Sequence, residues 1–279
     1  MKVTVLSDNV SDPYGLFAAE HGLSLWIEFD GKKILYDTGL SDLYLQNAQK
    51  LSIDISEADF GVVSHGHYDH TGGLGSFLLN NTRAEVFLHK KAWDKHLSLN
   101  TGAMRQIGMD HELRKKYSGR FVEIEHDVIG FPFSFIVNDG NGVGFQPSGN
   151  KNLLVETESG ILEDNFLHEL IFVVDTGDSL AVFCGCSHQG AGNAVKRVNQ
   201  NFPGRSISAF FGGFHISKPR EDELSEDPET LHVFADELLS FGVEKYFTGH
   251  CTGSKGFAEM CLNMGTRLEG FYAGKTVIV

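Results

Sequence analysis

Residues 62–73, VVSHGHYDHTGG, constrain this chain more than any other segment. An apolar run ends at Ser64, and three imidazoles and one carboxylate follow within the next six residues. Imidazole and carboxylate groups are ligands for borderline and hard divalent metals, and a compact turn can direct them at two adjacent centres. A solvated turn that holds three histidines by chance is disfavoured, because histidine is scarce and the spacing is tight. The segment therefore predicts a metal site.

Further histidines follow predicted strands elsewhere in the chain. His188 lies two residues beyond Cys186, after one apolar run, while His215 and His250 follow two later runs beside glycines. In α/β proteins the carboxyl ends of strands gather ligands from distant parts of the chain. Each histidine alone is typical of a hydrogen-bonded structural residue, but three in equivalent places favour metal ligands.

The composition limits the class of partner. The 279 residues include 23 Lys+Arg and 37 Asp+Glu, a net charge of −14, with 41% hydrophobic residues. This balance excludes a disordered chain and disfavours nucleic-acid or anionic-membrane binding, which depends mainly on Lys and Arg. Four cysteines are too few for a disulfide scaffold, and no signal peptide or membrane span is recognisable. We expect a cytoplasmic protein that binds a small molecule, with no nucleic-acid or membrane partner.

The order of predicted elements indicates an α/β fold. Asp30-Gly31 predicts a hairpin turn in a strand-rich first half, and strands alternate with helices from about residue 170 onward. This order favours two sheets in one core with helices outside, in one domain over residues 1–279. The stretch near 98–150 is the least regular, and it is interpreted as a variable insertion beside the site or as a plain surface excursion. Predicted helices are Ser41–Leu51, Lys90–Leu97, Gly192–Asn201, Pro228–Ser240 and Ser254–Met264.

The His-x-His-x-Asp-His pattern at 65–70, with Thr-Gly-Gly after it and Asp37-Thr38-Gly39 before it, resembles the metallo-β-lactamase superfamily. The resemblance covers nearly the whole chain and implies an αββα sandwich, in which two mixed sheets pack face to face between helices. It also implies that Asp37 supports the ligand turn by hydrogen bonding. Further motifs are similar to a cytosolic subgroup named for an archaeal dihydropteroate synthase-like enzyme of methanopterin biosynthesis; they lie at residues 6–9, 20–24, 185–190, 212–215 and 250–253.

The resemblance implies a ligand set for two divalent metal ions. His65 and His67 match ligands of a first metal, and Asp69 and His70 match ligands of a second. His250 matches the histidine that closes the second site. Zinc is the expected metal, with manganese and iron as alternatives.

Two positions depart from the superfamily pattern. Where a bridging aspartate normally follows a strand-ending glycine, Gly185 is followed here by Cys186, with His188 two residues on. No Gly-His-Thr turn precedes residue 170, and His168 lies in about that place. We therefore expect His188 as a ligand, with Cys186 and His168 as weaker candidates. A buried structural thiol is the alternative interpretation of Cys186.

The ligand set implies a reaction class. We predict a metal-dependent hydrolase that acts on a phosphorylated or pterin-like small molecule through a metal-bound hydroxide, which Asp69 would orient. His215, followed by Lys218 and Arg220, would place positive charge at the mouth of the site; a solvated basic turn is the alternative. A transferase that displaces pyrophosphate, as the subgroup's synthase does, is the second hypothesis. A non-catalytic metal-binding module is a lesser one.

A predicted helix start fits a phosphorylated ligand. Its free amides and its dipole would favour an anion, although ordinary capping by Ser254 is an equal alternative. The Glu20-His21 pair could reach the site from a first-half loop or make a structural hydrogen bond. The predicted phosphate-binding residues at the helix start are Thr252, Gly253, Ser254 and Lys255.

Overall fold

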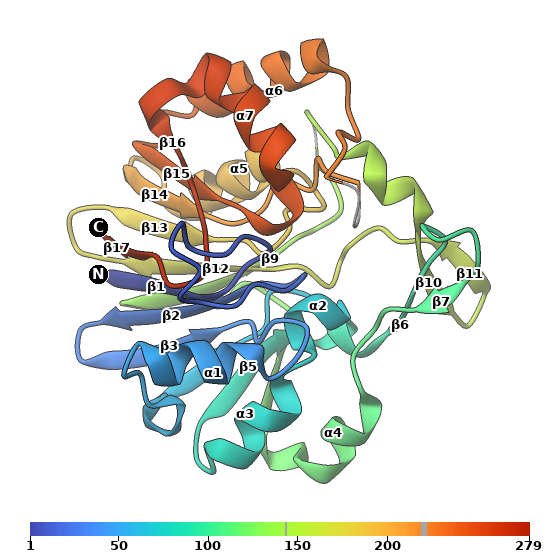
Figure 1. Cartoon of the computed structure of the whole chain (residues 1–279). Helices are drawn as coiled ribbons and strands as arrows, with labels where there is room; N and C mark the ends of the chain where they lie inside the picture. Colours follow the sequence, from blue (N-terminus) through green and yellow to red (C-terminus); the bar gives the residue numbers. More distant parts are fainter. Residues whose placement is uncertain (143, 219–221) are drawn as a thin grey trace.

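Two β-sheets lie face to face in the computed structural model of the chain, which describes residues 1–142, 144–218 and 222–279 (Figure 1). Helices cover both outer faces, which confirms the αββα sandwich. Within the described residues the first sheet has seven strands, in the order β17 (Thr276–Ile278), β1 (Lys2–Ser7), β2 (Ser24–Phe29), β3 (Lys32–Tyr36), β4 (Phe60–Val62), β5 (Glu85–His89) and β8 (Phe121–Ile124). The second has six there, in the order β16 (Leu268–Gly270), β15 (Lys245–Thr248), β14 (Ile207–Phe211), β13 (Leu180–Phe183), β12 (Leu170–Asp175) and β9 (Phe133–Val137).

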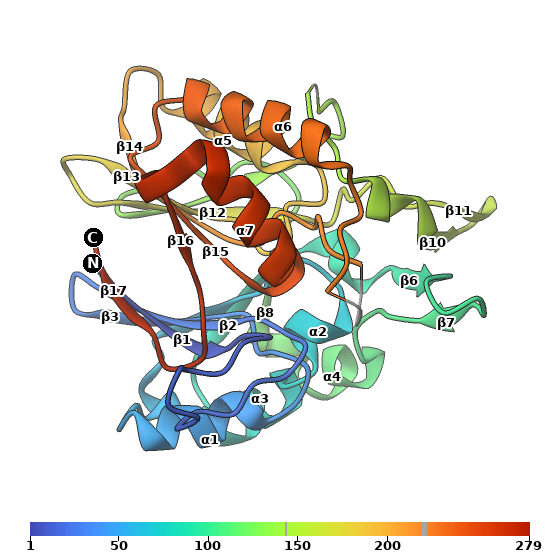
Figure 2. The same ribbon diagram turned by 45° about the horizontal axis from the view of Figure 1, so that its top comes forward.

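The helices divide between the two outer faces (Figures 1 and 2). The first sheet carries α1 (Leu43–Lys50) and α3 (Leu74–Asn80), and the second carries α5 (Ala191–Asn201), α6 (Pro228–Ser240) and α7 (Gly253–Met264). The predicted start of α6 is confirmed, because the Asp227 carboxylate accepts a hydrogen bond from the Thr230 N–H at 2.9 Å and Pro228 occupies the first turn. No helix in the described ranges has the length and apolar character that a bilayer crossing requires.

Apolar side chains fill the space between the sheets. Phe172, Phe183 and Phe211 come from adjacent strands of the second sheet, and all are fully buried. The rings of Phe183 and Phe211 stack with centroids 4.7 Å apart. Burial of each such side chain contributes about 1.5–3 kcal/mol, so the near-continuous apolar runs of β12–β14 are explained by contacts on both faces of the sheet.

A small third sheet stands beside the sandwich, on the side where α2 (Tyr68–Thr71) lies (Figures 1 and 2). The helix predicted at Lys90–Leu97 is wrong: a 3₁₀ turn covers Lys90–Trp93, and strand β6 (Lys95–Ser98) follows because its residues pair with β10 (Leu153–Thr157). The third sheet consists, among the residues described, of β11 (Gly160–Glu163), β10 (Leu153–Thr157), β6 (Lys95–Ser98) and β7 (Arg105–Gln106).

The stretch 98–150 is divided between different parts of the fold. β7 belongs to the third sheet, and α4 (His111–Lys116) packs near α3 through Leu113. β8 and β9 instead lie in the two main sheets. The segment expected to be an insertion therefore also supplies core strands.

Candidate metal centre

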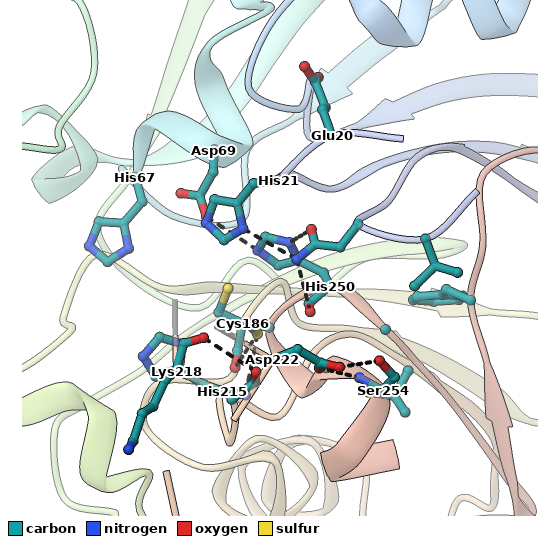
Figure 3. Close-up of a pocket in the computed structure, with 18 of the residues that line it drawn as sticks. Glu20, His21, His67, Asp69, Cys186, His215, Lys218, Asp222, His250 and Ser254 are labelled. Atoms are coloured by element: carbon teal, nitrogen blue, oxygen red, sulfur yellow. Dashed lines mark hydrogen bonds and ion pairs between the residues drawn. The ribbon is translucent and has the colours of Figure 1, made fainter. Parts of the chain in front are cut away.

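Ligand candidates from distant parts of the chain, among them His67, Asp69, Cys186 and His250, line one pocket (Figure 3). β4 ends at Val62 and leads into the ligand turn, which we define as residues 64–70. β13, β14 and β15 are parallel to one another and end shortly before Cys186, His215 and His250. Because parallel strands present their carboxyl ends at one edge, His70 and His250 come into contact although 180 positions separate them.

Backbone strain is concentrated at this same end. Asp37, Ser187, His215 and His250 adopt positive φ angles of 55°, 54°, 51° and 49°. For residues other than glycine, such conformations cost about 1–3 kcal/mol each and persist where the surroundings impose them, most often at functional sites. The strain therefore marks these strand ends as a candidate site independently of their side-chain chemistry.

Asp37 supports the ligand turn, as the family resemblance implies. Its buried carboxylate accepts hydrogen bonds from the Ser64 N–H at 2.7 Å and from the Ser64 hydroxyl at 2.7 Å. It also accepts one from Nδ1 of His70 at 2.6 Å. The proton on Nδ1 leaves Nε2 of His70 to face the interior of the site. Close packing holds the same turn, because a Cβ at Gly66 would overlap the carbonyl group of Ala92.

His65, His67 and His188 form the first group of candidate ligands. Nε2 of His65 lies 3.1 Å from Nδ1 of His67, and one ring nitrogen from each of the three residues lies within 4.8 Å of the others. Nε2 of His188 has no hydrogen-bond partner among the described residues. Burial, followed by neighbouring imidazoles, holds the pKa of His65 well below its ordinary value, and burial does the same for His67 and His188. Neutral imidazoles with free lone pairs are the form that binds a metal.

Asp69, His70 and His250 form the second group, with Cys186 between the two groups. Nε2 of His70 lies 3.2 Å from Nε2 of His250 and 3.1 Å from Sγ of Cys186, and Oδ2 of Asp69 lies 3.3 Å from Nε2 of His250. Burial alone would raise the pKa of Asp69, but hydrogen bonds from His21 and His250 hold it well below its ordinary value. Burial lowers the pKa of His70, whereas Asp37 raises it to about 9. A metal bound at Nε2 of His70 would therefore displace a proton.

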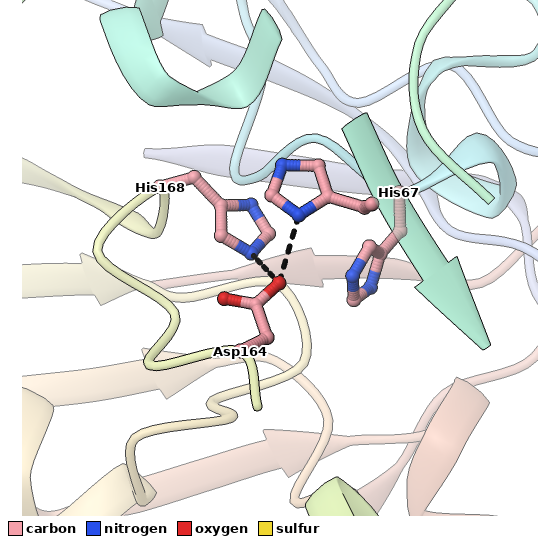
Figure 4. Close-up of side chains that lie close together, drawn as sticks. His67, Asp164 and His168 are labelled. Atoms are coloured by element: carbon pink, nitrogen blue, oxygen red, sulfur yellow. Dashed lines mark hydrogen bonds and ion pairs between the residues drawn. The ribbon is translucent and has the colours of Figure 1, made fainter. Parts of the chain in front are cut away.

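His168, a weaker ligand candidate, lies close to His67, with ring centroids 5.1 Å apart, and faces Asp164 (Figure 4). Its Nδ1 accepts a hydrogen bond from the Gly66 N–H at 2.9 Å, and its Nε2 lies 3.4 Å from Oδ2 of Asp164. The same carboxylate oxygen lies 2.7 Å from Nδ1 of His96, whose ring stacks on that of His168 with centroids 3.9 Å apart. His168 thus holds the backbone of the turn, and it also belongs to a buried group of possible ligands with His67, His96 and Asp164.

The residues predicted to bind phosphate are already paired with neighbouring groups. Thr252 is fully buried, and its hydroxyl accepts a hydrogen bond from the Phe214 N–H at 3.0 Å. The Ser254 N–H donates to the Asp222 carboxylate at 2.7 Å, and Nζ of Lys255 pairs with Glu223 at 2.5 Å. Gly253 and Ser254 line the pocket, but a carboxylate caps this helix start, so the geometry speaks against an anion there.

The two ligand groups open onto a pocket of about 740 Å³ (Figure 3). His215 is buried in its wall with its ring centroid 4.2 Å from that of His188, while Lys218 is exposed at the lining; Arg220 lies outside the described residues. His21 reaches the site, since its Nε2 lies 3.2 Å from Oδ2 of Asp69. Glu20 instead has a structural role, accepting hydrogen bonds from backbone N–H groups after β3.

Several side chains that no sequence motif predicted as site residues contact the candidate ligands from behind. Oδ1 of Asn150 lies 3.0 Å from Nδ1 of His188, and Oδ1 of Asn9 lies 2.8 Å from Nδ1 of His250. Asp164 and His96 were missed as well. Asn9 falls within a motif shared with the subgroup, whereas Asn150, Asp164 and His96 carry no local signal, because only tertiary contacts bring them to the site.

Comparisons with known proteins extend the similarity over the whole fold. A family model described as the metallo-β-lactamase superfamily matches residues 19–151. The chain is 26% identical over 289 residues to 7,8-dihydropterin-6-methyl-4-(β-D-ribofuranosyl)-aminobenzene-5′-phosphate synthase of Methanocaldococcus jannaschii, covering 99% of this chain and 96% of that protein. It is 30% identical over 266 residues to the uncharacterized protein MJ0448 of the same organism, covering 92% and 93% of the two chains.

Structural similarity points the same way. The crystal structure of Tm1679, a metal-dependent hydrolase of the β-lactamase superfamily, matches with a TM-score of 0.80 and 31% identity, covering 100% of this chain and 99% of that one. The similarity to the synthase fits the methanopterin-type subgroup that the motifs indicate. With the ligand turn, the αββα sandwich and these relatives in agreement, the chain belongs to the metallo-β-lactamase superfamily.

Proposed function

We propose that the protein is a metal-dependent hydrolase acting on a phosphorylated or pterin-like small molecule. The observation that carries the proposal is the pair of adjoining, buried ligand groups at the base of a pocket of about 740 Å³. Nε2 of His65 lies 3.1 Å from Nδ1 of His67 in the first group, and Nε2 of His250 lies 3.3 Å from Oδ2 of Asp69 in the second. Such a pocket suits a small molecule, since ligand sites are typically about 300–1,000 Å³. The net charge of −14 disfavours a long polyanion such as RNA.

The donor set fits divalent metal ions. His65, His67 and His188 offer neutral, buried ring nitrogens, and His70, His250 and Asp69 offer a second set beside them. Ions bound there would acidify a water molecule and polarise a phosphoryl or carbonyl oxygen. Zinc is the proposed metal. Manganese and iron are alternatives, because imidazole and carboxylate ligands bind all three metals.

Asp69 and His215 have the proposed catalytic roles. Because its pKa lies well below the ordinary value, Asp69 is ionised at neutral pH and can accept a hydrogen bond from an attacking water. Its fixed contacts with His21 and His250 keep the carboxylate pointed into the pocket. His215 lines the same pocket beside His188, where it can hold a proton for the leaving group.

A transferase that displaces pyrophosphate is the second candidate. It is favoured by the 26% identity to the M. jannaschii synthase over 99% of this chain. In that case the same ligand groups would hold the pyrophosphate end of one substrate, while the pocket would admit an aryl acceptor. The two candidates share the metal centre and differ in the nucleophile.

Elemental analysis and one substrate pair test these proposals. Protein purified without added metal is expected to hold stoichiometric transition metal and to release pyrophosphate from a pterin pyrophosphate. Release without an acceptor supports hydrolysis, and release only with an aminobenzene acceptor supports the transferase. Protein that holds no transition metal, and remains inactive after metal is added, would show that the proposed chemistry is wrong.

We further propose that Cys186 is a thiolate ligand in place of the missing bridging carboxylate. Its Sγ lies 3.1 Å from Nε2 of His70 and belongs to candidate groups with His65 and with His250. We expect cobalt-substituted protein to show a thiolate-to-metal charge-transfer band that Cys186→Ser abolishes. Cys261→Ser, at a half-buried thiol on α7, serves as the matched control and should retain the band. A band that persists in Cys186→Ser would identify Cys186 as a structural thiol.

A further inference from the structure

Arg105 on β7 is a half-buried cation that lines the pocket. Its Nε is buried without a hydrogen-bond partner among the described residues, and the one hydrogen bond described for its guanidinium runs from Nη2 to the Tyr68 hydroxyl at 3.3 Å. Arg197 and Arg205, by contrast, each bind an aspartate, at 2.9 Å and 2.8 Å. Leaving the Nε–H donor buried without an acceptor is costly, and a ligand in the pocket would supply that acceptor.

Contacts with Tyr68 place Arg105 beside the ligand turn. The guanidinium lies over the Tyr68 ring, with Cζ 5.3 Å from the centroid. Tyr68 directly follows His67, and its N–H donates to the Ile107 carbonyl at 2.8 Å. Since Arg105 and Ile107 lie on one short segment, the cation is tied to the same turn that carries the metal-ligand candidates.

The surroundings of Arg105 form one end of the pocket. Arg105 and Tyr68 line it together with Ile107 and Leu153, which pack into a small apolar cluster with Phe166. The acidic lining residues are engaged elsewhere: Asp222 caps α7, Asp69 contacts His21 and His250, and Glu20 accepts hydrogen bonds from backbone N–H groups after β3. A guanidinium beside an apolar wall, free of carboxylates, can bind a planar or tetrahedral oxyanion through two parallel hydrogen bonds.

We propose that Arg105, held against Tyr68, binds a terminal oxyanion of the substrate. Under the proposed function, on which this inference rests, that group is a phosphate monoester; a carboxylate has the same recognition chemistry. The apolar wall would contact the body of the same molecule, and its reacting group would lie over the ligand turn. This places the anion-binding site on the third sheet rather than at the start of α7.

Ligands of matched shape test the assignment by calorimetry on metal-loaded protein. The probes are benzylphosphonate, phenylacetate and the neutral 2-phenylethanol. Arg105→Met is expected to weaken benzylphosphonate binding about 10- to 100-fold, the range for a lost charge-assisted hydrogen-bond pair, and to leave 2-phenylethanol unchanged. Arg105→Lys should weaken benzylphosphonate binding by an intermediate factor. Lysine keeps the positive charge but loses the planar guanidinium that donates two parallel hydrogen bonds. Lys95→Met, which removes an exposed cation of the same sheet that does not line the pocket, is the matched control and should change binding less than about fivefold.

The outcomes separate the site from its ligand and from the proposed reaction. A loss confined to benzylphosphonate assigns a phosphate, and an equal loss for phenylacetate assigns a carboxylate. No loss in Arg105→Met, or an equal loss for all three probes with an unchanged melting temperature, would overturn the proposal. Metal content is measured in every sample: wild type without metal would contradict the proposed function, while the difference between wild type and Arg105→Met would still report on Arg105.

Discussion

His67→Ala is expected to lose bound metal and to lower any metal-dependent turnover more than about 100-fold. Removing a side chain that only hydrogen-bonds to a metal ligand lowers metal affinity or activity by up to about 100-fold. Removing the ligand itself should have a larger effect. His67 contacts His65 through Nδ1 at 3.1 Å and belongs to a second buried group with Asp164 and His168. The substitution therefore removes the one candidate ligand that the two buried groups share.

His126→Ala provides the matched control for this prediction. His126 is exposed on the loop between β8 and β9, so the same substitution there should leave the metal content unchanged. Metal per chain is measured by elemental analysis after gel filtration, and the melting temperature is recorded for each variant. If His67→Ala kept the full metal content of wild type, the ligand assignment of the turn would be wrong.

Asp37→Ala is expected to lower the free energy of unfolding by about 3–5 kcal/mol in the metal-free protein. The substitution leaves the Ser64 N–H, the Ser64 hydroxyl and Nδ1 of His70 buried without their acceptor. Removal of Asp37 leaves the His70 imidazole buried without its charged partner. Each donor that loses its acceptor adds its own cost of desolvation. Asp37→Asn should cost less, because it keeps one acceptor and tolerates the φ of 55°.

Urea unfolding in the presence of a chelator measures these differences. Asp59→Ala is the control, since Asp59 accepts a backbone N–H from Lys33 at 2.9 Å but lies near the surface, and its loss should cost about 1 kcal/mol. In metal-loaded protein, Asp37→Ala should also weaken metal binding about 10- to 100-fold, because His70 loses the partner that orients it. A cost below about 1 kcal/mol for Asp37→Ala would show that the three hydrogen bonds do not stabilise the turn.

Sequence patterns predicted the elements whose residues contact both faces of a sheet or carry clear caps. β12, β13 and β14 lie in the predicted alternation of strands and helices, and their runs are apolar because both faces are buried. The helix predicted at Pro228–Ser240 is α6, whose start Asp227 caps. The helix predicted at Lys90–Leu97 was wrong, and β8 and β9 were not recognised. Short strands such as β6 are stabilised by their pairing with distant strands, which no local pattern records.

The candidate site likewise contains residues that the sequence predicted and residues that only the tertiary structure places there. Residues 64–70 lie within one turn, so the sequence alone determined that imidazoles and a carboxylate would face a common point, and Asp37 and His250 followed from the family resemblance. Only the tertiary structure decided that His168 supports the turn from behind, that Asp222 caps the helix expected to bind phosphate, and that Arg105 reaches the pocket. The residues of the ligand turn are neighbours along the chain, so a local pattern predicts them. Each of the other contacts joins residues far apart in sequence. The packing of the sheets sets the distances between those residues and their burial.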